Sequence, residues 1–190
     1  MEVKDFILAS GSPQRIALLR QIAYEPKRIQ PADIDESCLP HEEPLLYVRR
    51  MALEKARHVA ALSPKENVLA CDTSVVVGKR ILHKAKDENE QRQVMQLLSG
   101  RTHRVISSVC LISKTGKVSQ RTSVTKILMK ALSEEEIESY IKSGEWKGVC
   151  GYKIEGLLAG YVVRMLGSYS GVVGLPLYET LNLLKGENIR

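Results

Sequence analysis

Residues 102–130 read THRVISSVCLISKTGKVSQRTSVTKILMK, and this stretch decides the fold class of the 190-residue chain. Two runs rich in β-branched residues, 102–113 and 117–130, flank a turn with Gly116, which is typical of a β-hairpin. Outward from it, strands are expected at 3–9, 68–77, 80–84 and 161–166. Helices are expected at 14–22, 45–62, 87–98, 133–143 and after Pro176. The mixture predicts an α/β fold, a mixed β-sheet flanked by helices.

The composition restricts the class of protein. Hydrophobic residues make up 44% and charged residues 26%, as in ordinary soluble domains. No linker or repeat interrupts the chain, so we expect one domain over residues 1–190. The first residues lack a basic segment followed by an apolar run, and no apolar run reaches the length of about 18 residues that a membrane span needs. We therefore expect a cytoplasmic protein without a membrane span.

The cysteines carry no recognisable motif. They are widely spaced and form no CxxC pair, so a disulfide framework and structural zinc are not expected. No arginine stands six residues beyond any of them, which excludes a phosphatase-type cysteine nucleophile. The four are Cys38, Cys71, Cys110 and Cys150.

The charge balance indicates an anionic partner. The net charge is +6 and the isoelectric point is near 9.1. No run of five basic residues occurs, and aromatic residues make up only 5%, which is poor material for base stacking. A small phosphorylated substrate is favoured over stable binding of nucleic acid.

A turn of small residues joins the first expected strand to the first expected helix. Such a turn presents backbone N–H groups at the positive end of the helix dipole, where phosphate binds readily. Ser10 and Ser12 add hydroxyl groups there, with Ser12 as the N-cap, and Arg15 adds a fork of donors. The alternative is an ordinary capped helix with Arg15 in solvent. Neither a Walker loop nor a dinucleotide fingerprint occurs.

Two charged residues interrupt apolar patterns. Lys55 lies on the apolar face of the helix at 45–62, and Asp72 lies within the apolar strand at 68–77. A buried charge must be paired, bound to metal or carried to water by a long side chain. Both residues point to a cleft for an anion and a metal, with a snorkelling lysine and a structural aspartate as alternatives. Lys55→Ala is expected to lower activity and to stabilise the fold by removing a charge from an apolar stripe.

Further residues complete this candidate site. Lys84 follows Asp72 across a short hairpin, although a lysine there is also compatible with the surface. Glu36, with Asp33 and Asp35, forms an acidic patch whose oxygens suit Mg²⁺ or Mn²⁺ shared with substrate phosphates; a solvated acidic loop is the alternative. Cations for phosphate and carboxylates for metal, without a nucleophilic triad, describe attack by water on phosphorus.

Motifs along almost the whole chain resemble those of the Maf family of septum-formation inhibitors. They run in order from residue 7 to about residue 184. The motifs are ILASGSP at 7–13 with Arg15, IDE at 34–36, EKA at 54–56, Asp72-Thr73, LSGRTHRV at 98–105, Tyr152 with Ile154 and Gly156, GSY at 167–169 and VGLPL at 173–177.

The resemblance implies a fold and an activity. The fold is an elongated mixed sheet related to that of inosine triphosphate pyrophosphatases, with a cleft between two lobes. The activity is metal-dependent hydrolysis of nucleoside triphosphates to the monophosphate and pyrophosphate by a homodimer. The family is further associated with clearing non-standard or modified nucleotides and with arrest of septum formation. A nucleotide-sensing regulator with weak catalysis is the alternative.

The resemblance also implies roles for matching residues. Asp72 becomes the proton acceptor, and with Glu36 a metal ligand. The remaining roles are catalysis for Lys55 and Lys84, phosphate binding for Ser10, Ser12 and Arg15, and base selection for Gln14, Thr73 and Glu155.

This chain departs from the family pattern where the base is read. Gln14 stands where a second arginine is usual, Glu155 replaces a glutamine, and Cys150 replaces a glycine. Thr73 resembles the thymidine and uridine branch of the family. However, an ionised carboxylate only accepts hydrogen bonds, so Glu155 favours guanine or cytosine, which present donors, over thymine and uracil.

Overall fold

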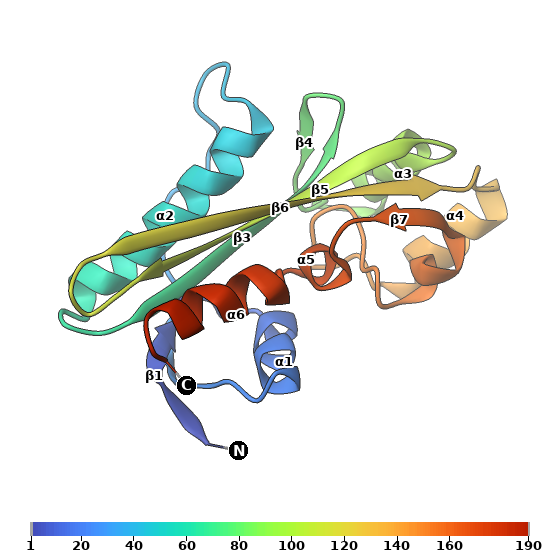
Figure 1. Ribbon diagram of the computed structural model, residues 1–190. Coiled ribbons are helices and arrows are strands. Elements are labelled where there is room, and N and C mark those ends of the chain that lie inside the picture. The colour runs from blue at the N-terminus through green and yellow to red at the C-terminus, as the bar shows by residue number, and fades with distance from the viewer. Residues whose placement is uncertain (1, 190) are drawn as a thin grey trace.

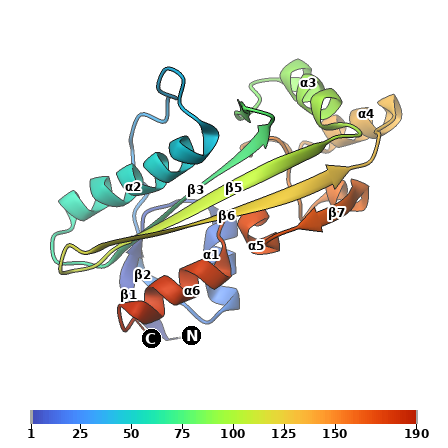
Figure 2. The ribbon, with the colours of Figure 1, turned by 45° about the horizontal axis from the view of Figure 1, so that its top comes forward.

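The computed structural model describes residues 2–189 and is organised around the long hairpin of β5 (Thr102–Ile112) and β6 (Val118–Met129) (Figure 1). The two strands pair without interruption from Thr102 opposite Leu128 to Ile112 opposite Val118. Nearly every residue of β5 is buried, whereas β6 leaves much of its length partly exposed. The predicted hairpin is confirmed, and it spans the long dimension of the sheet (Figure 2).

Seven strands form one mixed sheet in the order β2-β1-β3-β5-β6-β7, with β4 paired to β3. Only the pairings of β1 with β2 and with β3 are parallel. The other strands are β1 (Val3–Leu8), β2 (Glu25–Ile29), β3 (Val68–Val77), β4 (Arg80–Leu82) and β7 (Val162–Leu166). Only β2 was not expected from sequence. Its residues EPKRI are mostly polar and exposed, so no apolar pattern marks it.

Helices cover both faces of this sheet. α2 packs along one face of β3 and β5, and α6 packs beside α1 on the opposite side (Figure 1). The helices are α1 (Pro13–Gln21), α2 (Pro44–Leu62), α3 (Glu88–Leu98), α4 (Glu134–Ser143), α5 (Tyr169–Val173) and α6 (Leu177–Gly186), with a 3₁₀ turn η1 (Leu157–Tyr161). None of these helices, in the part of the chain that the structure describes, is long and apolar enough to cross a membrane.

Local signals set the starts of the helices. Ser12 caps α1 ahead of Pro13, and Ser133 forms a capping box with Glu136 at the start of α4, as predicted. A short helix that the sequence did not predict, α5, begins at Tyr169, shortly after the segment expected to be the last strand. The side chain of Ser168 accepts a hydrogen bond from the backbone of Gly171 and starts this short helix.

The core is divided along the sheet. One cluster lies among α3, α4 and β7 and includes Met95, Tyr140 and Trp146. Two others lie under α1 and α6 and under α2, around Phe6 and Val59. The sheet passes through all of them, and the candidate site lies on the strand β3, which runs from one end to the other.

Candidate active site

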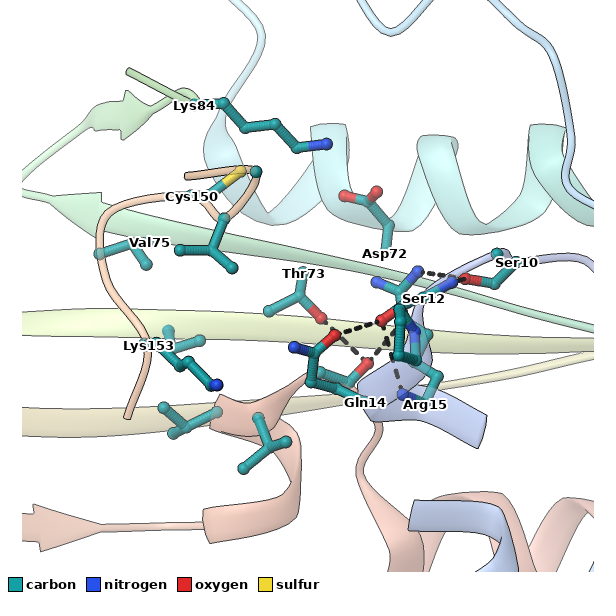
Figure 3. A pocket seen from close by; sticks show the side chains of 18 of the residues that line it. Ser10, Ser12, Gln14, Arg15, Asp72, Thr73, Val75, Lys84, Cys150 and Lys153 are labelled. Atoms are coloured by element: carbon teal, nitrogen blue, oxygen red, sulfur yellow. Dashed lines mark hydrogen bonds between the residues drawn. The ribbon is translucent and has the colours of Figure 1, made fainter. Parts of the chain in front are cut away.

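A cavity with a volume of about 450 Å³ opens over β3. One side is built from the turn before α1, from α2 and from β3, and we call it the helix–strand wall. The opposite side is the segment 148–155, which we call the loop wall (Figure 3). All ten site residues expected from sequence line the cavity: Ser10, Ser12, Gln14, Arg15, Glu36, Lys55, Asp72, Thr73, Lys84 and Glu155.

An ion cluster forms the centre of the helix–strand wall. The Lys55 ammonium lies 2.7 Å from the Asp72 carboxylate and 3.0 Å from that of Glu36. Lys55 is 8% exposed and Asp72 5%, so the lysine is paired and does not snorkel to solvent. Lys55 is also the only described side chain that donates a hydrogen bond to Asp72.

This pairing overturns the premise that Lys55 is an isolated charge on an apolar stripe. Removing the lysine would leave Asp72 as a buried carboxylate without a counter-charge, which is strongly destabilising. The expected gain in stability for Lys55→Ala is therefore replaced by an expected loss.

The acidic segment before α2 divides into two parts. Glu36 lines the cavity, and its backbone carbonyl accepts a hydrogen bond of 2.8 Å from the Tyr47 hydroxyl. Asp35 does not line the cavity, and its carboxylate accepts hydrogen bonds from the backbone N–H and the hydroxyl of Ser37. Those two bonds lower the pKa of Asp35. Of the expected acidic patch, only Glu36 is available to a ligand in the cavity.

Arg15 is held at the cavity by the C-terminal part of the chain. Its Nε donates to the carbonyl of Gly174 at 2.9 Å, and its Nη1 donates to the Ser10 hydroxyl at 2.9 Å. Gly174 ends α5 with φ of 136°, a conformation that other residues rarely adopt. The alternative of a solvated Arg15 is excluded, since two bonds fix the guanidinium beside the helix N-terminus.

Lys84 reaches the same centre from outside the helix–strand wall. It follows β4 and pairs as an isolated β-bridge with Cys150 of the loop wall. Its side chain points towards Asp72 (Figure 3). Within residues 2–189 its ammonium has no ion pair or hydrogen bond, so it remains available to an anion.

The residues expected to read the base lie away from this ion cluster. Gln14 accepts a hydrogen bond of 3.2 Å from the Ser12 hydroxyl. Thr73 shares one of 2.8 Å with Ser107, so its hydroxyl is already engaged. Glu155 is exposed at the rim. Sequence reasoning missed Lys153, which also lines the cavity and points towards Gln14 (Figure 3).

Buried polar side chains anchor the loop wall from behind, a role that the sequence did not reveal although two of them lie in the family motifs. Gln91 donates to the carbonyl of Gly151 at 2.8 Å, and the imidazole of His103 lies 2.7 Å from the Tyr152 hydroxyl. Burial lowers the pKa of His103 to about 4. Gln91 shares the buried face of α3 with Met95, and a polar residue on an apolar stripe was the signal that could have identified it.

The carboxylates of the cavity could bind a divalent metal ion only if substrate phosphates supplied further ligands. Among residues 2–189, no group of three or more His, Cys, Asp or Glu side chains is placed to hold an ion. Glu36 and Asp72 do converge on one point, at Lys55. Mg²⁺ commonly uses one or two carboxylates, substrate phosphates and several waters, which this pair of carboxylates could serve.

Comparison with known proteins identifies the family. The sequence model described as "Maf-like protein" matches residues 5–187. The chain belongs to the Maf family. The family expectation from the sequence motifs is thereby confirmed.

Relatives of this Maf protein carry a common name. A protein of Caulobacter vibrioides named dTTP/UTP pyrophosphatase is 49% identical over 185 residues, covering 97% of this chain and 96% of the relative. Proteins with the same name from Mesorhizobium japonicum and Paramagnetospirillum magneticum are 48% and 50% identical, covering 99% and 95% of this chain and 94% and 95% of the relatives. A solved Ham1 protein of Staphylococcus aureus aligns with a TM-score of 0.48 and 12% identity, over 67% of this chain and 72% of that one.

Proposed function

We propose that this chain hydrolyses nucleoside triphosphates, with dTTP and UTP as preferred substrates, to the monophosphate and pyrophosphate. The observation that carries the proposal is the convergence of Lys55, Asp72 and Glu36 beside Arg15 in one cavity. The names of the relatives support the same activity and supply the preferred bases.

The helix–strand wall supplies the chemistry. Asp72 takes a proton from the attacking water, whose oxygen bonds to the α-phosphorus while the bond to the oxygen bridging to the β-phosphorus breaks. Pyrophosphate leaves with that bridging oxygen. Lys55 holds the Asp72 carboxylate in place, and Arg15 and Lys84 bind the phosphate oxygens, whose negative charge they offset.

A divalent cation, Mg²⁺ or Mn²⁺, is part of the proposal. Glu36 and Asp72 would hold it together with the substrate phosphates. When bound, the ion neutralises charge on the phosphates and polarises the phosphorus centre.

The preferred base differs from the one that Glu155 led us to expect from sequence. Relatives named dTTP/UTP pyrophosphatases support thymine and uracil in place of guanine and cytosine. Glu155 is exposed at the rim, where solvent weakens the repulsion between a carboxylate and a carbonyl oxygen.

Product analysis in ¹⁸O-labelled water tests the reaction. Incubation of dTTP with Mg²⁺ or Mn²⁺ should give dTMP and pyrophosphate, with the label in dTMP, because water attacks the α-phosphorus. A control with EDTA should be inactive. Label in pyrophosphate, or release of orthophosphate with dTDP, would contradict the proposal. Tight binding of nucleotide without turnover would favour the alternative, a sensor with weak catalysis.

The wider implications of family membership stay predictions. These are a homodimer, a cytoplasmic location, clearance of modified nucleotides and a link to septum formation. Comparing pseudouridine triphosphate and 5-methyl-UTP with UTP checks the third, because a clearing enzyme should hydrolyse modified nucleotides at least as fast as UTP.

A further inference from the structure

Lys153 is the one cation of the loop wall that faces the cavity without a described partner. Its neighbours Tyr152 and Ile154 are core residues, 7% and 4% exposed, and they fix the backbone on both sides of it. Its own backbone N–H donates to the Tyr140 hydroxyl at 3.0 Å. Within residues 2–189 its ammonium forms no hydrogen bond or ion pair. A lysine held in this way presents a donor to whatever occupies the cavity.

Gln14 on the opposite wall presents a second donor. The Ser12 hydroxyl occupies its amide oxygen at 3.2 Å, which leaves the amide nitrogen as the group directed into the cavity. Figure 3 shows Lys153 and Gln14 pointing towards one another, below the side chains of Asp72 and Lys84. Two donors therefore face each other at the end of the cavity away from the ion cluster.

We propose that Lys153 determines base specificity by donating a hydrogen bond to a carbonyl oxygen of uracil or thymine, with the Gln14 amide serving the other carbonyl. The proposal rests on the function proposed above. Uracil presents carbonyl oxygens on both sides of its ring N–H. Donors on two facing walls match that pattern, whereas the exocyclic amine of cytosine puts a donor against a donor.

The position of Lys153 favours the base over the phosphates as its partner. Arg15, Lys55 and Lys84 already supply three cations to the cavity. Lys55 is paired with Asp72, and Figure 3 draws the Lys84 side chain beside Asp72, above Gln14 and Lys153. The cavity lining also includes the apolar side chains of Val75, Val172 and Val173, which suit the flat face of a base and not a phosphate. Figure 3 draws Val75 on the same side of the cavity as Lys153.

UTP and CTP provide the sharpest test, since they share sugar, phosphates and ring size and differ at the pairing edge. Lys153→Met keeps the apolar stem and removes the donor, and Lys153→Arg keeps a donor. The kcat/KM ratio of UTP to CTP should fall roughly 10-fold or more in Lys153→Met, which corresponds to one well-made hydrogen bond. It should stay near the parental value in Lys153→Arg and in the exposed control Lys142→Met.

The possible outcomes distinguish failure of the specificity proposal from failure of the proposed hydrolytic function. If the parent releases pyrophosphate from no triphosphate, the proposed function fails. If the parent is active but Lys153→Met lowers UTP and CTP turnover by the same factor, Lys153 binds phosphate or ribose, and the specificity proposal is overturned. An unchanged ratio with unchanged rates also overturns it, while the proposed function stands.

Discussion

The two walls of the cavity differ in how their charges are held. On the helix–strand wall, Lys55 is within 3.0 Å of two carboxylates and Arg15 is fixed by two hydrogen bonds of 2.9 Å. On the loop wall, the backbone is anchored from behind by Gln91, but the charged ends of Lys153 and Glu155 have no described partners. The helix–strand wall is preorganised by its own polar network, whereas the loop wall presents charged groups that have hydrogen-bonding capacity left for a ligand.

The difference assigns different tasks to the two walls. Catalytic groups must be held close to their productive geometry before substrate arrives, and a paired network does so at no cost during reaction. Groups that discriminate between bases must instead be free to form hydrogen bonds with the bound base. Changes in the paired ionic groups of the helix–strand wall should therefore abolish turnover for every nucleotide, whereas changes at Lys153 on the loop wall should alter the choice of nucleotide.

The largest effect is expected for Asp72→Asn. The amide keeps the shape of the side chain but cannot take a proton from water, and loss of an acid–base group costs roughly 100- to 10,000-fold in rate. Pyrophosphate release should fall equally for UTP and CTP, with a retained cooperative melting transition. Asp5→Asn, a change at an exposed ion pair with Lys27, is the control and should remain active. Near-parental rates in Asp72→Asn would remove Asp72 from the catalytic set.

Lys55→Met should cost both activity and stability. Breaking a buried ion pair by removing one partner typically destabilises by about 3–5 kcal/mol, because an uncompensated charge is left behind. Urea denaturation at pH 7 measures the loss. The double variant Lys55→Met/Asp72→Asn should recover part of it, since the stranded carboxylate is gone. A more stable Lys55→Met protein would show that the pair does not support the fold.

The two walls also differ in how well their residues could be predicted from the sequence. Lys55 and Asp72 broke apolar patterns, so their place at a common cleft could be anticipated without the structure, whereas their pairing with each other could not. Lys153 lies in an irregular segment with no period to break, and the strand β2 has no apolar alternation. The fold and the helix–strand wall were accordingly predictable, while the direction of side chains on the loop wall required tertiary structure.

The loop wall should respond to acid through His103. Burial places its pKa at about 4 in the folded state, below the ordinary value of about 6.5. The unfolded chain thus binds more protons in this window, so stability is complete above pH 6.5 and is lost as pH falls towards 4. The difference amounts to about 3 kcal/mol. The variant His103→Gln keeps a hydrogen-bonding group for Tyr152 but does not titrate. Between pH 7 and pH 4 its free energy of unfolding should therefore fall by about 3 kcal/mol less than that of the parent protein. Equal acid sensitivity of the two proteins would contradict a buried neutral imidazole.

The smallest effect is expected for Glu155→Gln. If Glu155 disfavours thymine and uracil as its charge suggests from sequence, this change should improve hydrolysis of dTTP and UTP relative to the parent by roughly 10-fold or more, since a glutamine can donate to a carbonyl and a carboxylate cannot. The structure places Glu155 at the exposed rim, where solvent screens its charge. Lys153 and Gln14 already supply donors deeper in the cavity. We therefore expect the UTP to CTP ratio to change by less than about threefold, within the range of an exposed hydrogen bond. The ratio of kcat/KM values in the parent, Glu155→Gln and Lys153→Met decides between the two residues. A large gain for UTP in Glu155→Gln, with no loss in Lys153→Met, would move base selection from the interior of the loop wall to its rim.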